Sequence, residues 1–134
     1  MNYDGFIGQV RSRGRLSSLG DAVKATRAVL ETLSERLPLD EVKDLAAQLP
    51  SEIAYYLRQR SAFLDKFGLD DFFKRVSERE PADLPVATYH ARVVISVIKD
   101  AVTPGEMEDI RAQLPAEFAP LFETGWQGEM KKAA

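Results

Sequence analysis

Two pairs of carboxylates with equal spacing are the residues whose arrangement most directly suggests chemistry. Glu41 precedes Asp44 by three positions, and Glu106 precedes Asp109 by the same interval. In a helix this spacing places both members of a pair on one face. One interpretation is a site for a divalent metal. The interpretation we favour is an acidic first turn that meets the positive end of the helix dipole.

The other residue types that commonly do chemistry are scarce. His90 is the only histidine, and the chain has no cysteine. A Ser–His–acid hydrolase would have to use His90, but no Gly-x-Ser-x-Gly elbow accompanies it. A dinuclear centre in a helical bundle would need a Glu-x-x-His element, and Ala87 stands where that glutamate would be. We therefore predict no catalytic, cofactor-binding or metal-binding residues, favour a protein without catalytic activity, and expect a structural or exposed role for His90.

Two arginines and three aromatic residues are the candidates for a partner or ligand surface. Arg27 and Arg92 lie beside predicted apolar stripes, and a guanidinium can fork around phosphate or carboxylate. The interpretation we favour is an ion pair from each arginine to the next short helix, with Asp44 and Asp109 as acceptors. Tyrosine and tryptophan are enriched at interface hot spots, and core packing is their alternative role. The aromatic candidates are Tyr55, Tyr56 and Trp126.

Part of the sequence recurs at a fixed distance along the chain. The segment AAQLPSEIA at residues 46–54 returns as RAQLPAEFA at residues 111–119, an offset of 65 positions. At this offset eleven of the 36 positions from residue 22 to residue 57 are identical, and apolar positions and helix breakers stay in step. Internal repetition of this kind indicates duplicated structural units. We infer a single domain, residues 1–134, that holds repeat 1 at about 3–60 and repeat 2 at about 69–125.

The repeat also decides the fold class. The run VVISVI at residues 93–98 is by itself typical of a buried strand, but its counterpart at residues 28–33 has helical spacing. Copies of one unit share one structure, so we predict an all-α, bundle-like domain of about eight helices, several of them short. Ser18, Asp40 and Thr103 are the expected N-caps. The helices are expected near residues 2–13, 18–36, 40–49, 50–60, 70–80, 84–101, 104–114 and 115–124, with 128–134 as a frayed tail.

The composition argues against nucleic-acid and membrane partners. The net charge is −3, whereas nucleic-acid binding usually needs an excess of Lys and Arg. The one basic cluster, Arg11, Arg13 and Arg15, is interpreted as a solvated loop rather than a phosphate contact. Residues 93–102 are the longest apolar-rich stretch and are too short to span a membrane, and residues 1–15 lack the apolar run of a secretory signal. We expect a cytoplasmic protein.

Four segments resemble a known family. They are ATRAVL from residue 25, RLP from residue 36, AAQLP from residue 46 and LFETGW from residue 121. Together they resemble the bacterial domain-of-unknown-function family 2267 over nearly the whole chain. The resemblance implies duplicated helical units in the bacterial cytoplasm, and it implies no activity, cofactor or catalytic residue.

Three functional hypotheses follow. The first is a helical protein-interaction or regulatory module that binds a protein partner between the repeats or self-associates. The second is a small-ligand-binding protein or enzyme with a pocket at the inter-repeat junction. The third is a nucleic-acid-associated protein.

Overall fold

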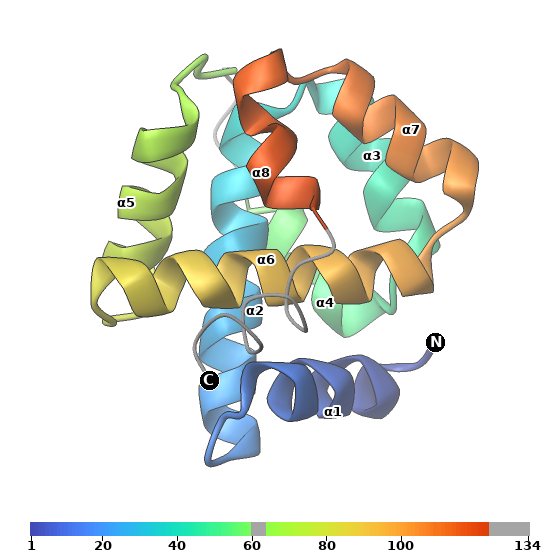
Figure 1. Ribbon diagram of the computed structural model, residues 1–134. Helices are drawn as coiled ribbons and strands as arrows, with labels where there is room; N and C mark the ends of the chain where they lie inside the picture. The colour runs from blue at the N-terminus through green and yellow to red at the C-terminus, as the bar shows by residue number, and fades with distance from the viewer. Residues whose placement is uncertain (60–63, 124–134) are drawn as a thin grey trace.

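The computed structural model describes residues 1–59 and 64–123, and in these ranges every regular element is a helix (Figure 1). The predicted all-α class is confirmed. The run at residues 93–98 is helical, as its alignment with residues 28–33 required. The predictions for Trp126 and for the tail at 128–134 lie outside the described residues. The elements are α1 (Tyr3–Gly14), α2 (Leu19–Arg36), α3 (Leu39–Gln48), α4 (Ser51–Leu57), α5 (Leu69–Arg79), α6 (Leu84–Ala101), α7 (Pro104–Ala112), the 3-10 turn η1 (Ala116–Phe118) and α8 (Ala119–Phe122).

Two of the three expected N-caps are confirmed. The Ser18 side chain accepts from the backbone N–H of Asp21 at 3.1 Å, and Thr103 accepts from that of Glu106 at 3.2 Å. The prediction for Asp40 is wrong. Pro38 is the last non-helical residue before α3, so Asp40 already lies inside the first turn. The basic cluster was also misplaced, because α1 continues as a helix to Gly14.

The long helices α2 and α6 contact one another at the centre of the structure. In Figure 1, α6 crosses α2, while α1 and α5 lie on different sides of the crossing. Helix α1 packs against both α2 and α6, and α5 likewise packs against both. The short helix α4 lies against α2, and α8 lies against α6. This leaves α3 and α7 in contact with one another, away from α1 and α5.

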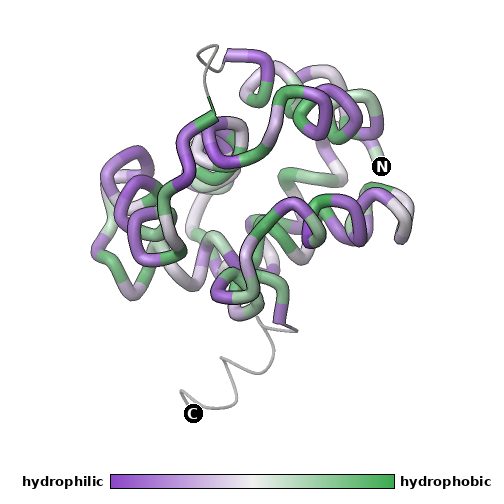
Figure 2. Tube along the Cα trace, turned by 90° about the horizontal axis from the view of Figure 1, so that it is seen from above, coloured by the Kyte–Doolittle hydropathy of each residue, from purple (hydrophilic) through white to green (hydrophobic). Residues whose placement is uncertain are grey.

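The amphipathic character of the helices explains this packing. Figure 2 shows hydrophobic and hydrophilic positions interspersed along the helices, as is typical of helices that bury one face. The largest fully buried side chains come from most of the helices and form one core. None of the described helices combines the length and the apolar character that crossing a membrane requires. The core includes Phe6, Leu30, Ile53, Phe72, Ile98 and Phe118.

Ion pairs fasten α1 and α5 to the long helices. Arg13 of α1 reaches Asp100 of α6 at 2.5 Å. Arg79 of α5 contacts both carboxylate oxygens of Glu35 on α2, each at 2.8 Å. Arg75 approaches Glu35 as well, at 3.3 Å. These pairs connect the outer helices to α2 and α6.

Candidate carboxylate site

The fold brings Glu41 and Glu106 together where α3 meets α7. Each residue lies in the first turn of its helix, and the cap at Thr103 fixes where α7 begins. Leu45 and Ile110, four residues further along, are buried. Residues four apart share a helix face. The apolar faces that pack α3 against α7 therefore carry both glutamates inward.

The two glutamates are almost completely buried, at 6% and 5% exposure. Carboxylate oxygens of Glu41, Glu106 and the exposed Asp109 all lie within 4.8 Å of one another. Asp44 is close enough for its charge to act on Glu106. We call Glu41, Asp44, Glu106 and Asp109 the carboxylate site. It combines two acids from each helix.

The electrostatics of the carboxylate site favour one retained proton. Burial raises the pKa of Glu106 to about 8, and the hydrogen bond with Glu41 and the charges of Glu41, Asp44 and Asp109 act in the same direction. Two carboxylates this close cannot both ionise freely in a poorly solvated place. At neutral pH and without a cation, Glu106 therefore keeps its proton and shares it with Glu41.

Hydrogen bonding leaves part of this site unsatisfied. Among the described residues, neither Oε2 of Glu41 nor Oε2 of Glu106 has a hydrogen-bond partner, although both atoms are buried. A buried acceptor without a partner costs about 1–3 kcal/mol.

Glu41 and Glu106 lie in the first turns of their helices, whereas Asp44 and Asp109 lie beyond them. The interpretation as an acidic first turn that interacts with the helix dipole does not account for the burial of both glutamates where α3 meets α7. Two features of the sequence could have predicted that Glu41 and Glu106 meet. The two glutamates occupy equivalent positions at the 65-residue offset, and each lies four residues before a core side chain.

The predicted arginine pairs are wrong. Arg27 Nε contacts Glu31 Oε2 at 3.2 Å on its own helix, and Arg92 reaches Glu123 at 3.4 Å. Glu31 lies one turn after Arg27, so the local pair forms without any tertiary contact. The position equivalent to Glu31 is Ser96, which carries no charge. The two arginines therefore have different partners despite their equivalent places.

Tyr55 and Tyr56 contact one another, and Arg27 lies close enough for its charge to act on Tyr56. Tyr55 is 58% exposed, and its ring meets the Tyr56 ring edge-to-face at a centroid distance of 5.9 Å. Tyr56 is half-buried, and burial is the main cause that raises the pKa of its hydroxyl, while the charge of Arg27 acts against it. We call Arg27, Tyr55 and Tyr56 the tyrosine–arginine patch. Arg92 on α6 is not part of it.

His90, for which a structural or exposed role is predicted, is buried rather than exposed. It is 7% exposed, and its Nδ1 contacts Oε2 of Glu80, which is also buried. Glu80 follows the last residue of α5, so the pair ties the end of α5 to α6. Glu80 was not predicted as the partner of His90, because no spacing rule links residues on different helices in this way.

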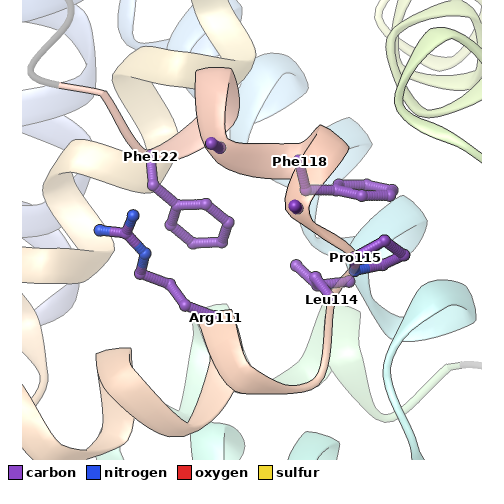
Figure 3. Close-up of a pocket in the computed structure, with 7 residues that line it drawn as sticks. Arg111, Leu114, Pro115, Phe118 and Phe122 are labelled. Carbon is purple, nitrogen blue, oxygen red and sulfur yellow. The ribbon is translucent and has the colours of Figure 1, made fainter.

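A small pocket opens between α7 and α8 (Figure 3). Its volume is about 90 Å³, well below the roughly 300–1,000 Å³ of typical ligand sites. The Arg111 guanidinium lies over the Phe122 ring at 5.2 Å from its centroid and closes one side. Arg27 and Arg92 do not line it. A second, wider depression of about 380 Å³ is lined by Asp70, Phe73, Lys74, Leu84 and Thr88.

Comparison with models of protein families gives a match over nearly the whole chain. The model of the family described as "Uncharacterized conserved protein (DUF2267)" matches residues 3–121. None of the curated proteins matches the chain.

Proposed function

We propose that this chain, which belongs to the DUF2267 family, is a helical protein-interaction or regulatory module without catalytic activity. The observation that carries the proposal is the tyrosine–arginine patch. Tyrosine and arginine are enriched among the residues that dominate binding energy at protein interfaces. A cytoplasmic location in a bacterium is part of the same proposal.

The patch has the build of a binding anchor. The side chain of Arg27 is 62% exposed, so a partner can reach its guanidinium. Tyr55 projects into solvent while Tyr56 supports its ring from the half-buried side. A tyrosine held in place in this way loses little conformational entropy when a partner covers it.

A duplication underlies the proposed module. Helices α2 and α6 have 18 residues each and begin at Leu19 and Leu84, an offset of 65. The packing of α1 on α6 is matched by the packing of α5 on α2. The Arg13–Asp100 pair likewise corresponds to the Arg79–Glu35 pair. These relations support two equivalent units arranged about an approximate twofold axis that passes between α3 and α7.

One observation favours the second candidate function, a small-ligand-binding protein or enzyme. The carboxylate site lies where α3 of the first unit meets α7 of the second, which is the inter-repeat junction. Nucleic-acid binding has no comparable support, since the net charge is −3 and Arg13, Arg75 and Arg79 are engaged in ion pairs.

Affinity capture with matched variants tests the interaction module. The tagged wild-type chain, a double variant (Arg27→Ala with Tyr55→Ala) and the control Leu84→Ala are exposed to host lysate, and bound proteins are identified by mass spectrometry at low and high salt. Leu84 is 44% exposed and lies on α6. We expect one recurrent partner that the wild type and the control retain and the double variant loses.

Light scattering of the purified protein supplies the second arm. A defined oligomer that the double variant dissociates would identify the partner as a second copy of the chain. A monomer that captures nothing, or a partner that the double variant still retains, would overturn the proposal.

A further inference from the structure

We propose that the carboxylate site between α3 and α7 binds a divalent cation, with Glu41, Glu106 and Asp109 as ligands and calcium as the best-fitting ion. This goes beyond the interaction module, because it assigns an inorganic ligand to a different part of the surface.

The carboxylates of the site converge. Three carboxylates from two helices bring ligand oxygens within 4.8 Å of one another. Acids on a protein surface normally turn away from one another into water. Here the packing of α3 on α7 forces Glu41 and Glu106 to face one another, since both precede core residues on the contacting faces.

The hydrogen bonding of the two glutamates also indicates a ligand. Glu41 and Glu106 are more than nine-tenths buried, and each has a buried Oε2 atom without a hydrogen-bond partner among the described residues. A single shared proton satisfies one oxygen of each carboxyl group at most. A cation is the occupant that accepts electron pairs from several such oxygens at once.

The chemistry of the ligands selects the class of ion. The set offers only carboxylate oxygens, with no imidazole or thiolate, and hard cations such as Ca²⁺, Mg²⁺ and Mn²⁺ prefer such ligands. Ca²⁺ accepts about six to eight oxygen ligands in a flexible geometry, whereas Mg²⁺ demands near-ideal octahedral geometry and usually keeps several of its waters. A largely buried set of carboxylates therefore fits Ca²⁺ better than Mg²⁺.

Access and charge also suit a cation. Asp109 is exposed, so one side of the site opens to solvent, through which an ion can enter and from which water can complete its coordination. Asp44 adds a fourth negative charge close by. The bound ion would join α3 to α7 and thereby strengthen the contact between the two halves of the chain.

Titration of the metal-free chain with CaCl₂, MgCl₂ or MnCl₂ at pH 8.5 tests the proposal by calorimetry and by the thermal midpoint. Glu41→Gln and Glu106→Gln keep the side-chain shape and remove one charge. Glu108→Gln is the control, because Glu108 is an exposed acid on the same helix. We expect Ca²⁺ to bind with one-to-one stoichiometry and to raise the midpoint of the wild type and of the control, with binding at least tenfold weaker in both site variants.

Asp109→Asn guards against a site variant that fails to fold, because its exposed side chain contributes little to the core. It should weaken Ca²⁺ binding while its midpoint in EDTA stays near that of the wild type. Tighter binding of Mg²⁺ or Mn²⁺ would support a cation site and overturn the choice of calcium. Absence of heat with all three ions, or equal binding by the site variants and the control, would overturn the site.

Discussion

Arg36 donates from Nε to the carbonyl oxygen of Phe67 at 2.7 Å, across 31 residues of sequence. Its guanidinium also lies over the Phe118 ring at 5.2 Å from the centroid. Arg36 is 5% exposed, and burial is the main cause that lowers its pKa. One side chain thus connects α2 to the segment before α5 and to η1.

Replacement of Arg36 should be costly. Arg36→Met keeps much of the length but leaves the Phe67 carbonyl without this donor, and an unpaired buried group costs about 1–3 kcal/mol. We expect the free energy of unfolding to fall by about that amount in urea titrations. Arg27→Met is the control, since an exposed i, i+4 pair contributes about 0.3–0.5 kcal/mol. Equal losses in the two variants would contradict the prediction.

The shared proton of the carboxylate site makes stability depend on pH. The pKa of Glu106 is about 8 in the folded protein and 4.5 ordinarily, so between these values the folded state binds more protons than the unfolded state. The free energy of unfolding should therefore fall as the pH rises, by up to about 1.4 kcal/mol per pH unit. Urea unfolding in EDTA at pH 6, 7 and 8 measures this slope.

Two variants isolate this contribution. The side chain introduced by Glu106→Gln cannot ionise, so the free energy of unfolding of this variant should fall less steeply with pH than that of the wild type. The stability of the variant relative to the wild type should therefore increase toward pH 8. Glu108→Gln, which changes an exposed acid, should keep the wild-type slope. A Glu106→Gln protein with an unchanged slope would show that the proton is not held at this site.

Glu35 should contribute stability with the opposite pH dependence. Burial alone would raise its pKa, but the hydrogen bonds and charges of Arg79 and Arg75 outweigh burial and hold the pKa below its ordinary value. The contribution is present above the ordinary pKa of 4.5 and is lost as the pH falls through the lowered value. We expect Glu35→Gln to lower the free energy of unfolding by about 1 kcal/mol at pH 7, as is typical of a partly exposed ion-pair network. Near pH 3 the stability of the variant should approach that of the wild type. A deficit that persists unchanged at pH 3 would assign the loss to packing.

Two adjacent phenylalanines should differ strongly. Phe72 is fully buried and packs edge-to-face on both Phe73 and Phe118, whereas Phe73 is only partly buried. Phe72→Ala should cost about 3–5 kcal/mol by loss of transfer energy and creation of a cavity. Phe73→Ala should cost clearly less. Chemical denaturation of both variants measures the two losses in the free energy of unfolding. A larger loss for Phe73→Ala than for Phe72→Ala would contradict the prediction.

Much of the fold was predictable because helix breakers and caps act locally. Ser18 and Thr103 set the starts of α2 and α7 from a few neighbouring residues. The helical state of residues 93–98 followed from comparison with residues 28–33, which outweighed the strand preference of β-branched side chains. The error at Asp40 was one of register within a single turn.

The candidate site was harder to predict because its properties arise between helices. The spacing of Glu41 and Asp44 describes one helix, whereas the burial of Glu41 depends on how α3 meets α7. The same limit applies to Arg27, which pairs with Glu31 one turn away on its own helix and not with the predicted Asp44 on α3. Sequence patterns predict which residues share a face of one helix, but tertiary packing decides which residues of different helices come into contact.

The packing of α5 on α2, and of α1 on α6, has a consequence for how the chain can fold. A half-length polypeptide ending near residue 59 would leave the side of α2 that α5 covers open to water. Two such polypeptides could close one another's cores by exchanging these contacts, as subunits of a symmetric homodimer do. Because the two halves are covalently connected, the contacts between them form within a single chain and do not depend on protein concentration.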